Sequence, residues 1–247
     1  MGLRRLLKRA LRATRWDVVL VEESAHAAAR RVRLLRAMGI DLVLDVGANL
    51  GQFGRELRAR GYAGRIVSFE PLLAAHAVLA EVAARDGNWV AERLALGASP
   101  GTATIHVTAN LASSSFLDAT PRLGRTAPYA AVTGTEEVPV TTLAVAIERH
   151  VRPSDRAFLK IDTQGFEKVV LESAGGRLPR IDCIQVELAL QRTYRDQPDF
   201  DEMYRWFRER DYQLAVVEPG FSDPRSGIVL EVDATFVSRR WLEDLLP

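Results

Sequence analysis

Short apolar runs alternate along the chain with stretches in which apolar residues recur at helical spacing. The apolar runs predict strands at residues 41–46, 65–69, 89–94, 157–161 and 181–188. The stretches that follow them predict helices at residues 51–60, 72–85, 143–150, 166–172 and 200–209. This alternation is typical of an α/β fold, in which helices cover both faces of a mostly parallel sheet.

Two parts of the chain depart from the alternation. Residues 212–218 and 229–237 are apolar runs with no helix between them, which predicts an antiparallel hairpin and brings the core to about seven strands. Between the two halves, residues 102–107 and 138–140 predict short strands, and residues 108–137 read as a long polar loop. A loop of this length in a compact domain is usually functional or partly disordered.

The N-terminal region differs in charge from the rest of the chain. Residues 1–38 predict a helical extension, with helices at 4–15 and 24–38, ahead of a single domain at residues 39–247. The first sixteen residues hold six basic and no acidic side chains, and their leucines fall on one helical face. Such a helix can pack on the domain with a solvated basic face, or lie on an anionic membrane surface. The sequence leaves both open.

Composition limits the remaining partners and compartments. The 33 Lys and Arg residues balance 32 Asp and Glu residues, so no overall basic field indicates a nucleic-acid partner. No apolar run of 18 residues predicts a membrane span. A single cysteine, Cys183, excludes an internal disulfide and fits a reducing compartment, so we expect a cytoplasmic protein. The four histidines lack ligand spacing, and no metal motif is visible.

The glycine-rich turn "GANLG" at residues 47–51 follows a predicted strand and precedes a predicted helix, where open α/β sheets bind ligands. A dinucleotide fingerprint would place a second glycine at Asn49. Glu70 ends the next strand, where a carboxylate can accept the hydroxyls of a ribose. Asp45, at the end of the first strand, would repel a pyrophosphate but suits a ligand with an amino group or a sulfonium. S-adenosylmethionine carries both.

Six motifs follow one another in a specific order: "VLDVGANLGQF", "FEP", "LALG", "SSSF", "VTTL" and "FLKIDTQGFEKVVLESA". In this order they resemble the FkbM-type S-adenosylmethionine-dependent methyltransferases, from about residue 41 to about residue 188. The resemblance implies a class I methyltransferase fold, with a seven-stranded sheet whose last strand is antiparallel. It also implies O-methylation of a hydroxyl on a sugar, glycolipid or natural product. The chain departs from the pattern at Ala144, where aspartate often follows Leu143.

Together, the turn and the resemblance give a set of candidate cofactor-binding residues: Asp45, Gly47, Asn49, Gly51, Glu70 and Ala95. Methyl transfer to a hydroxyl also needs a base beside the reacting methyl group. Asp162, in "LKIDTQG", is the first candidate, and Glu187, at the end of the following strand, is the second. Lys160 shares a strand face with Asp162 and could pair with it, either for catalysis or as a structural ion pair. The two carboxylates could instead hold magnesium.

Two other functional classes remain open from the residues alone. A nicotinamide-dependent oxidoreductase would share the strand, turn and helix, although Asn49 and Asp45 disfavour it. A binding module that kept the fold without the chemistry is the second alternative. Ser113, Ser114 and Ser115, at the head of the polar segment, could line the pocket or form a turn.

Overall fold

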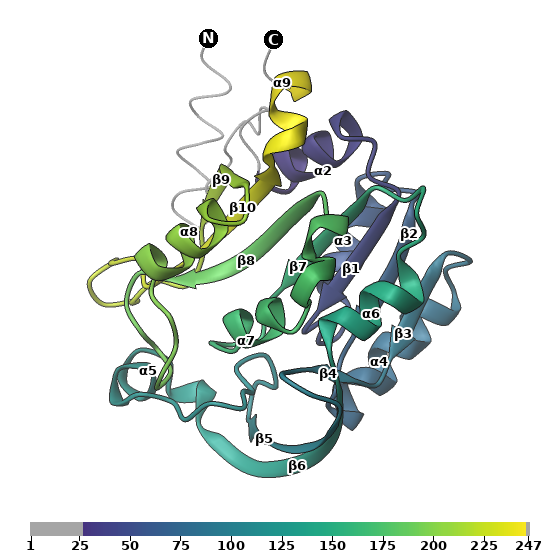
Figure 1. The fold of residues 1–247 in the computed structure, drawn as a ribbon. Helices are drawn as coiled ribbons and strands as arrows, with labels where there is room; N and C mark the ends of the chain where they lie inside the picture. Colours follow the sequence, from purple (N-terminus) through teal and green to yellow (C-terminus); the bar gives the residue numbers. More distant parts are fainter. Residues whose placement is uncertain (1–26, 246–247) are drawn as a thin grey trace, which may run out of the picture.

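A seven-stranded sheet forms the centre of the computed structural model, which describes residues 27–245 (Figure 1). The strand order is β3-β2-β1-β7-β8-β10-β9. All pairs from β3 to β8 are parallel, and β10 runs antiparallel to both β8 and β9. The strands are β1 Leu42–Val46, β2 Arg65–Phe69, β3 Trp89–Glu92, β7 Ala157–Ile161, β8 Cys183–Ala189, β9 Tyr212–Pro219 and β10 Glu231–Ser238. The predicted class I methyltransferase sheet and its C-terminal hairpin are therefore confirmed.

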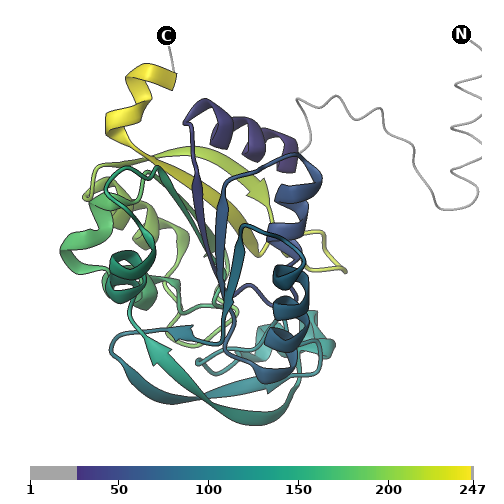
Figure 2. The ribbon, with the colours of Figure 1, turned by 90° about the vertical axis from the view of Figure 1, so that its right-hand side faces the viewer.

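Helices cover both faces of this sheet, as Figure 2 shows with the sheet seen along its edge. On one face lie α2 Ala27–Ala37, α3 Gln52–Ala59, α4 Leu73–Ala84 and α9 Leu242–Leu245. On the other lie α6 Leu143–His150, α7 Glu167–Glu172 and α8 Phe200–Arg208. Short 3-10 turns complete the connections: η1 Pro128–Ala130, η2 Gly175–Arg180 and η3 Arg239–Trp241. Because helices cover both faces of the sheet, β1 and β7 are buried along their whole length, and each is apolar except for one charged residue, Asp45 in β1 and Lys160 in β7.

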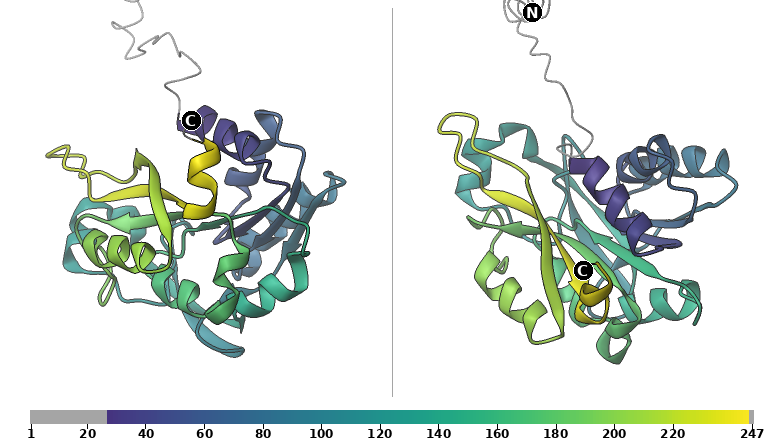
Figure 3. Two further views of the ribbon diagram at one scale, coloured as in Figure 1. Left: turned by 45° about the horizontal axis from the view of Figure 1, so that its top comes forward. Right: turned by 90° about the horizontal axis from the view of Figure 1, so that it is seen from above.

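The N-terminal helix of the described chain is part of the main core. Leu35 and Met38 are fully buried and belong to the same cluster as Val43 of β1. Figure 3 shows α2 beside α9 at one end of the molecule, and Trp241 packs against this cluster too. The basic helix predicted at residues 4–15 lies outside the described residues. Among residues 27–245, no helix has the length and apolar character needed to cross a bilayer.

A second, three-stranded sheet lies below the carboxyl ends of the large sheet in Figure 1, in the order β4-β6-β5. Its members are β4 Ala95–Leu96, β5 Gly101–Thr108 and β6 Val132–Thr141, and α5 Pro121–Thr126 lies between β5 and β6. The prediction of a loop through residues 108–137 was therefore wrong at both α5 and the first half of β6. Residues 132–135 are exposed, so that half of the strand carries no apolar alternation for the sequence to reveal.

Candidate functional site

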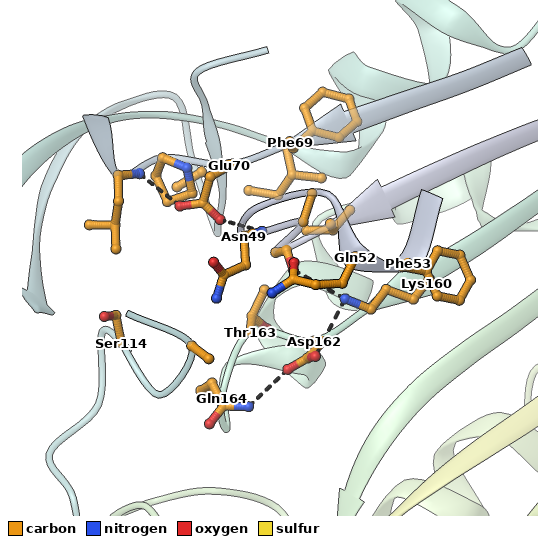
Figure 4. Close-up of a pocket in the computed structure, with 18 of the residues that line it drawn as sticks. Asn49, Gln52, Phe53, Phe69, Glu70, Ser114, Lys160, Asp162, Thr163 and Gln164 are labelled. Atoms are coloured by element: carbon orange, nitrogen blue, oxygen red, sulfur yellow. Dashed lines mark hydrogen bonds and ion pairs between the residues drawn. The ribbon is translucent and has the colours of Figure 1, made fainter. Parts of the chain in front are cut away.

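A cavity of about 580 Å³ lies between the two sheets, at the carboxyl ends of β1, β2 and β7 (Figure 4). The large sheet provides one wall through Gly47, Glu70 and Asp162. The small sheet and the segment after β5 provide the other, through Ala95, Ile105 and the residues around Ser114. The cavity thus lies where open α/β sheets bind their ligands.

The glycine turn closes the cavity at the end of β1. Gly47 has a left-handed φ of 73°, and a Cβ built on it would lie 1.9 Å from the carbonyl oxygen of Asp162. Asn49 also has a left-handed φ, of 48°, and lines the cavity. Gly51 does not line it; a Cβ there would lie 2.9 Å from Leu79 Cδ1. Its glycine is needed for packing against the helices behind the turn.

Glu70 lies at the end of β2 with both carboxylate oxygens engaged. Its Oε2 accepts from the backbone N–H of Asn49 at 2.8 Å, and its Oε1 accepts from that of Leu72 at 2.9 Å. Burial raises the pKa of Glu70 to about 7, although these hydrogen bonds oppose the shift. Each oxygen keeps a second lone pair for a ligand. Glu70 therefore fixes the glycine turn and presents acceptors to the cavity.

The part of the cavity next to Glu70 is apolar. Leu72, Ala95 and Ile105 belong to one buried cluster, and Phe116 packs against it. All four line the cavity, and Leu94 and Leu96 lie beside them. An apolar slot next to a paired set of acceptors suits a planar base attached to a sugar with free hydroxyls.

Lys160 lies on the opposite side of Asn49 from Glu70 (Figure 4). Its Nζ is 3.1 Å from the carbonyl oxygen of Gly47, 3.4 Å from Asp162 Oδ2 and 3.5 Å from Asp45 Oδ1. Burial would lower the pKa of Lys160, but the charges of Asp162 and Asp45 outweigh it and raise that pKa above its usual value. Lys160 therefore stays protonated and links the ends of β1 and β7.

Asp45 is fully buried and does not line the cavity. Its Oδ2 accepts from Ser68 Oγ at 3.0 Å, and Ser68 Oγ in turn accepts from Trp89 Nε1 at 3.0 Å. Burial raises the pKa of Asp45 against the attraction of Lys160. This geometry favours an action of Asp45 on Lys160 over direct contact with a ligand.

Gln164 connects the two carboxylates that the sequence singled out. Its Nε2 donates to Asp162 Oδ1 at 2.8 Å and to Glu187 Oε2 at 2.9 Å. Its Oε1 lies 2.9 Å from the hydroxyl of Tyr194. Asp162 and Gln164 line the cavity, whereas Glu187 lies behind them. The sequence prediction missed Gln164 and Tyr194. The motif "DTQG" could have indicated Gln164, because a turn that ends in glycine often has a left-handed residue before it, and Gln164 has a φ of 56°.

The serines at the head of the polar segment also divide into residues that line the cavity and residues that support it from behind. Ser114 lines the cavity, while Ser115 Oγ donates to the carbonyl oxygen of Gln164 at 2.7 Å and so supports that turn. Besides Gln164, six polar residues that line the cavity were not predicted: Arg31, Gln52, Glu56, Thr163, Gln185 and Asp233. Among residues 27–245, no group of three or more His, Cys, Asp or Glu side chains is arranged to hold a metal ion.

Comparison of the sequence with protein-family models identifies the family of the chain. The Methyltransferase FkbM domain matches residues 45–214, which include the glycine turn, Glu70, Asp162 and Glu187. The chain belongs to the FkbM methyltransferase family. It is an S-adenosylmethionine-dependent methyltransferase, which rules out the nicotinamide-dependent oxidoreductase that the glycine turn alone left open. No curated protein matches the sequence.

Solved structures with similar folds include two methyltransferases. Magnesium protoporphyrin IX methyltransferase from Synechocystis PCC 6803, with bound S-adenosylmethionine, has 10% identity and a TM-score of 0.47, over 96% of this chain and 97% of that one. A TehB-like methyltransferase from Corynebacterium glutamicum has 12% identity and a TM-score of 0.42, over 95% and 96% of the two chains. The family assignment rests on the FkbM domain match alone.

The residues of the cavity fit S-adenosylmethionine. Glu70 offers acceptors suited to the ribose hydroxyls, and the slot around Ala95 and Ile105 suits the adenine. Past Asn49, the carboxylate of Asp162 suits the positive end of the cofactor, which carries a sulfonium and an ammonium group. A pyrophosphate at the same place would be repelled by the carboxylate of Asp162.

Proposed function

We propose that this methyltransferase transfers a methyl group to a hydroxyl of a small acceptor, such as a sugar, a glycolipid or a natural product. The observation that carries the proposal is the position of Asp162. Its side chain is 38% exposed, lines the cavity beyond Asn49, and is held by Lys160 and Gln164. A carboxylate fixed at the cavity wall suits removal of a hydroxyl proton.

The cofactor supplies the electrophilic methyl group when bound. The residues of the chain then have three tasks: to hold the cofactor, to orient the acceptor oxygen, and to take its proton. In this proposal Asp162 takes the proton, and the ion pair with Lys160 orients its carboxylate. Gln164 donates to Asp162 Oδ1 and Lys160 Nζ lies 3.4 Å from Asp162 Oδ2, so the acceptor hydroxyl would approach a lone pair that these two contacts leave unused.

Glu187 has a different task in this proposal. Burial, and after it the charge of Asp162, raise the pKa of Glu187 well above its usual value. Two carboxylates joined through one amide cannot both stay charged at low cost, and burial makes Glu187 the one that favours its protonated form. Glu187 therefore supports Gln164 and Asp162 from behind the cavity wall.

The compartment, the membrane contact and the metal requirement of the enzyme are also proposals. We infer a cytoplasmic enzyme that does not act on nucleic acid, in keeping with the balanced charge of the chain. The basic helix that the sequence predicts at residues 4–15 can pack on the domain or lie on an anionic membrane surface, and the second arrangement would bring the enzyme to a lipid-linked acceptor. We assign no metal to the reaction, and a chelator tests that assignment.

Labelled cofactor tests the proposed reaction. The full-length protein is incubated with cell extract and methyl-labelled S-adenosylmethionine, and mass spectrometry locates the label. We expect the label on an oxygen of a small molecule, and we expect a chelator to leave the rate unchanged. Label on nitrogen, on protein or on nucleic acid would contradict the proposal, and the Asp162→Asn protein serves as the low-activity control.

A further inference from the structure

The cavity continues past Lys160 onto the face of the sheet beneath α2. Three polar residues line this extension: Arg31 of α2, Gln185 of β8 and Asp233 of β10. In the sheet register, Gln185 lies opposite Lys160, and Asp233 lies opposite Glu187. Neither Gln185 nor Asp233 has a part in the reaction described so far.

Gln185 has an unused hydrogen-bond acceptor. Its side chain is part of a residue only 3% exposed, yet Oε1 has no hydrogen-bond partner within residues 27–245. A buried polar atom without a partner costs free energy, so such atoms are uncommon unless a ligand or water meets them. Because Gln185 lines the cavity, a ligand in the extension can satisfy this oxygen.

Arg31 does not make the extension a site for anions. Its guanidinium donates to Glu56 at 3.0 Å and to Glu218 at 2.8 Å, and it lies over the ring of Phe53. Its charge is therefore already balanced by two carboxylates. Two acceptors line the extension, Gln185 Oε1 and the carboxylate of Asp233, and the Nε–H of Arg31 is a buried donor without a hydrogen-bond partner among residues 27–245. A hydroxyl can both donate and accept, so it suits such a mixed set. A ligand that donates hydrogen bonds and carries no negative charge fits this surface.

The cofactor is too short to fill the extension. Adjacent strands lie about 4.8 Å apart, so β10 lies roughly 19 Å across the sheet from β2, with three strands between them. Eight bonds join a ribose hydroxyl to the amino group of the cofactor, which is roughly 10 Å at full extension. A cofactor held at Glu70 therefore ends above β7, and Asp233 lies two strands beyond it.

We propose that Gln185 and Asp233 form the acceptor subsite, and that they bind hydroxyl groups of an uncharged polyol next to the one that is methylated. This inference rests on the proposed function, since it names the acceptor class for the same cavity. It predicts discrimination as well as binding, because phosphate or carboxylate groups on the acceptor would face Asp233 and Asp162.

The test separates acceptors by charge. Small molecules from cell extract are divided by anion exchange into unbound and bound fractions, and each is incubated with labelled S-adenosylmethionine and the full-length enzyme. We expect label in the unbound fraction, in a product that periodate cleaves because it contains neighbouring hydroxyls. Label only in the bound fraction, or in a periodate-resistant product, would overturn the subsite while leaving the proposed O-methylation intact. No label in either fraction would count against both.

Two variants then assign the residues. With the labelled acceptor fraction as substrate, Gln185→Leu and Asp233→Asn should each raise KM about tenfold or more, since each removes an acceptor for a substrate hydroxyl. Thr235→Val is the matched control, because Thr235 is buried opposite Gln185 but does not line the cavity. S-adenosylhomocysteine should bind all three proteins with near-normal affinity. An unchanged KM, or a tenfold loss of S-adenosylhomocysteine affinity, would overturn the assignment.

Discussion

Gly47 and the carbonyl oxygen of Asp162 are packed so closely that no side chain fits between them: a Cβ on Gly47 would lie 1.9 Å from that oxygen. The first glycine of the turn therefore packs the end of β1 against the end of β7. A glycine is needed there for packing within the protein, whether or not a ligand is bound. The placement of Asp162 depends on this contact.

Gly47→Ala should consequently destabilise the protein by about 2 to 5 kcal/mol, from the left-handed φ and from the steric clash together. Urea unfolding measures the change. Gly87→Ala is the control, because a Cβ there meets nothing within 4 Å. Equal stability of the two variants would mean that β1 and β7 separate at little cost.

Lys160 is predicted to stabilise the fold chiefly by neutralising Asp45. Lys160→Met leaves a fully buried carboxylate without its cation and should cost about 3 to 5 kcal/mol. Adding Asp45→Asn to that variant should recover much of the loss, since the buried charge is then gone. The partly exposed pair of Lys168 with Glu202 gives a comparison, and Lys168→Met should cost less than about 1 kcal/mol. Additive losses in the double variant would show that Lys160 and Asp45 act independently.

Cofactor affinity should depend on pH through Glu70. With a pKa of about 7 before the cofactor binds, Glu70 gains its charge as pH rises, and the charged form is the better acceptor for ribose hydroxyls. S-adenosylhomocysteine should therefore bind about tenfold more tightly at pH 8 than at pH 6. Glu70→Gln should bind more weakly at pH 8 and show no such dependence by calorimetry. A pH dependence that survives in Glu70→Gln would assign it to another group.

Asp162→Asn should separate chemistry from binding. A positioned base contributes about 10² to 10⁴ to the rate, so turnover should fall by that factor, far more than the affinity for S-adenosylhomocysteine, which loses only one attractive charge near its ammonium group. Glu187→Gln, which keeps the shape behind Gln164, should have a smaller effect on turnover. Retention of the parent rate by Asp162→Asn would remove it as the base, and recovery of activity with added magnesium would make the carboxylates metal ligands.

The basic N-terminal segment leads to a test with vesicles. If charge as well as apolar area drives membrane contact, the full-length protein should sediment with anionic vesicles and detach steeply as salt increases. Neutral vesicles are the control. Equal sedimentation with both kinds, or with neither, would leave only packing on the domain as the role of this segment.

The sequence revealed the large sheet because its central strands are buried on both faces and are therefore mostly apolar. β1 and β7 were bounded correctly to within a residue for this reason. Strand β6 was missed over its first half, because residues 132–135 are exposed and pair with β5 through backbone atoms that any sequence supplies. A strand that is exposed and held by backbone hydrogen bonds needs no alternation of apolar residues, so the sequence pattern does not reveal it.

The same limit applies to the cavity. Gly47, Glu70 and Asp162 could be predicted because each ends a strand of the parallel sheet, where position in the chain implies position in space. Asp233 reaches the cavity from β10, far from the glycine turn in sequence. Arg31 reaches it from α2, the helix before β1, and Gln185 lies in the middle of an apolar strand. Their proximity is a product of the tertiary fold, which no local pattern encodes.

The two walls of the cavity differ in what they can tolerate during evolution. On the side of the large sheet, Gly47 and Glu70 are fixed by contacts within the protein, so substitution there costs stability as well as function. On the side of the small sheet, the first half of β6 is solvent-exposed and shares no strand pairing with the large sheet. Residues 132–135 also do not line the cavity, so their sequence can change while the fold and both walls of the cavity are kept.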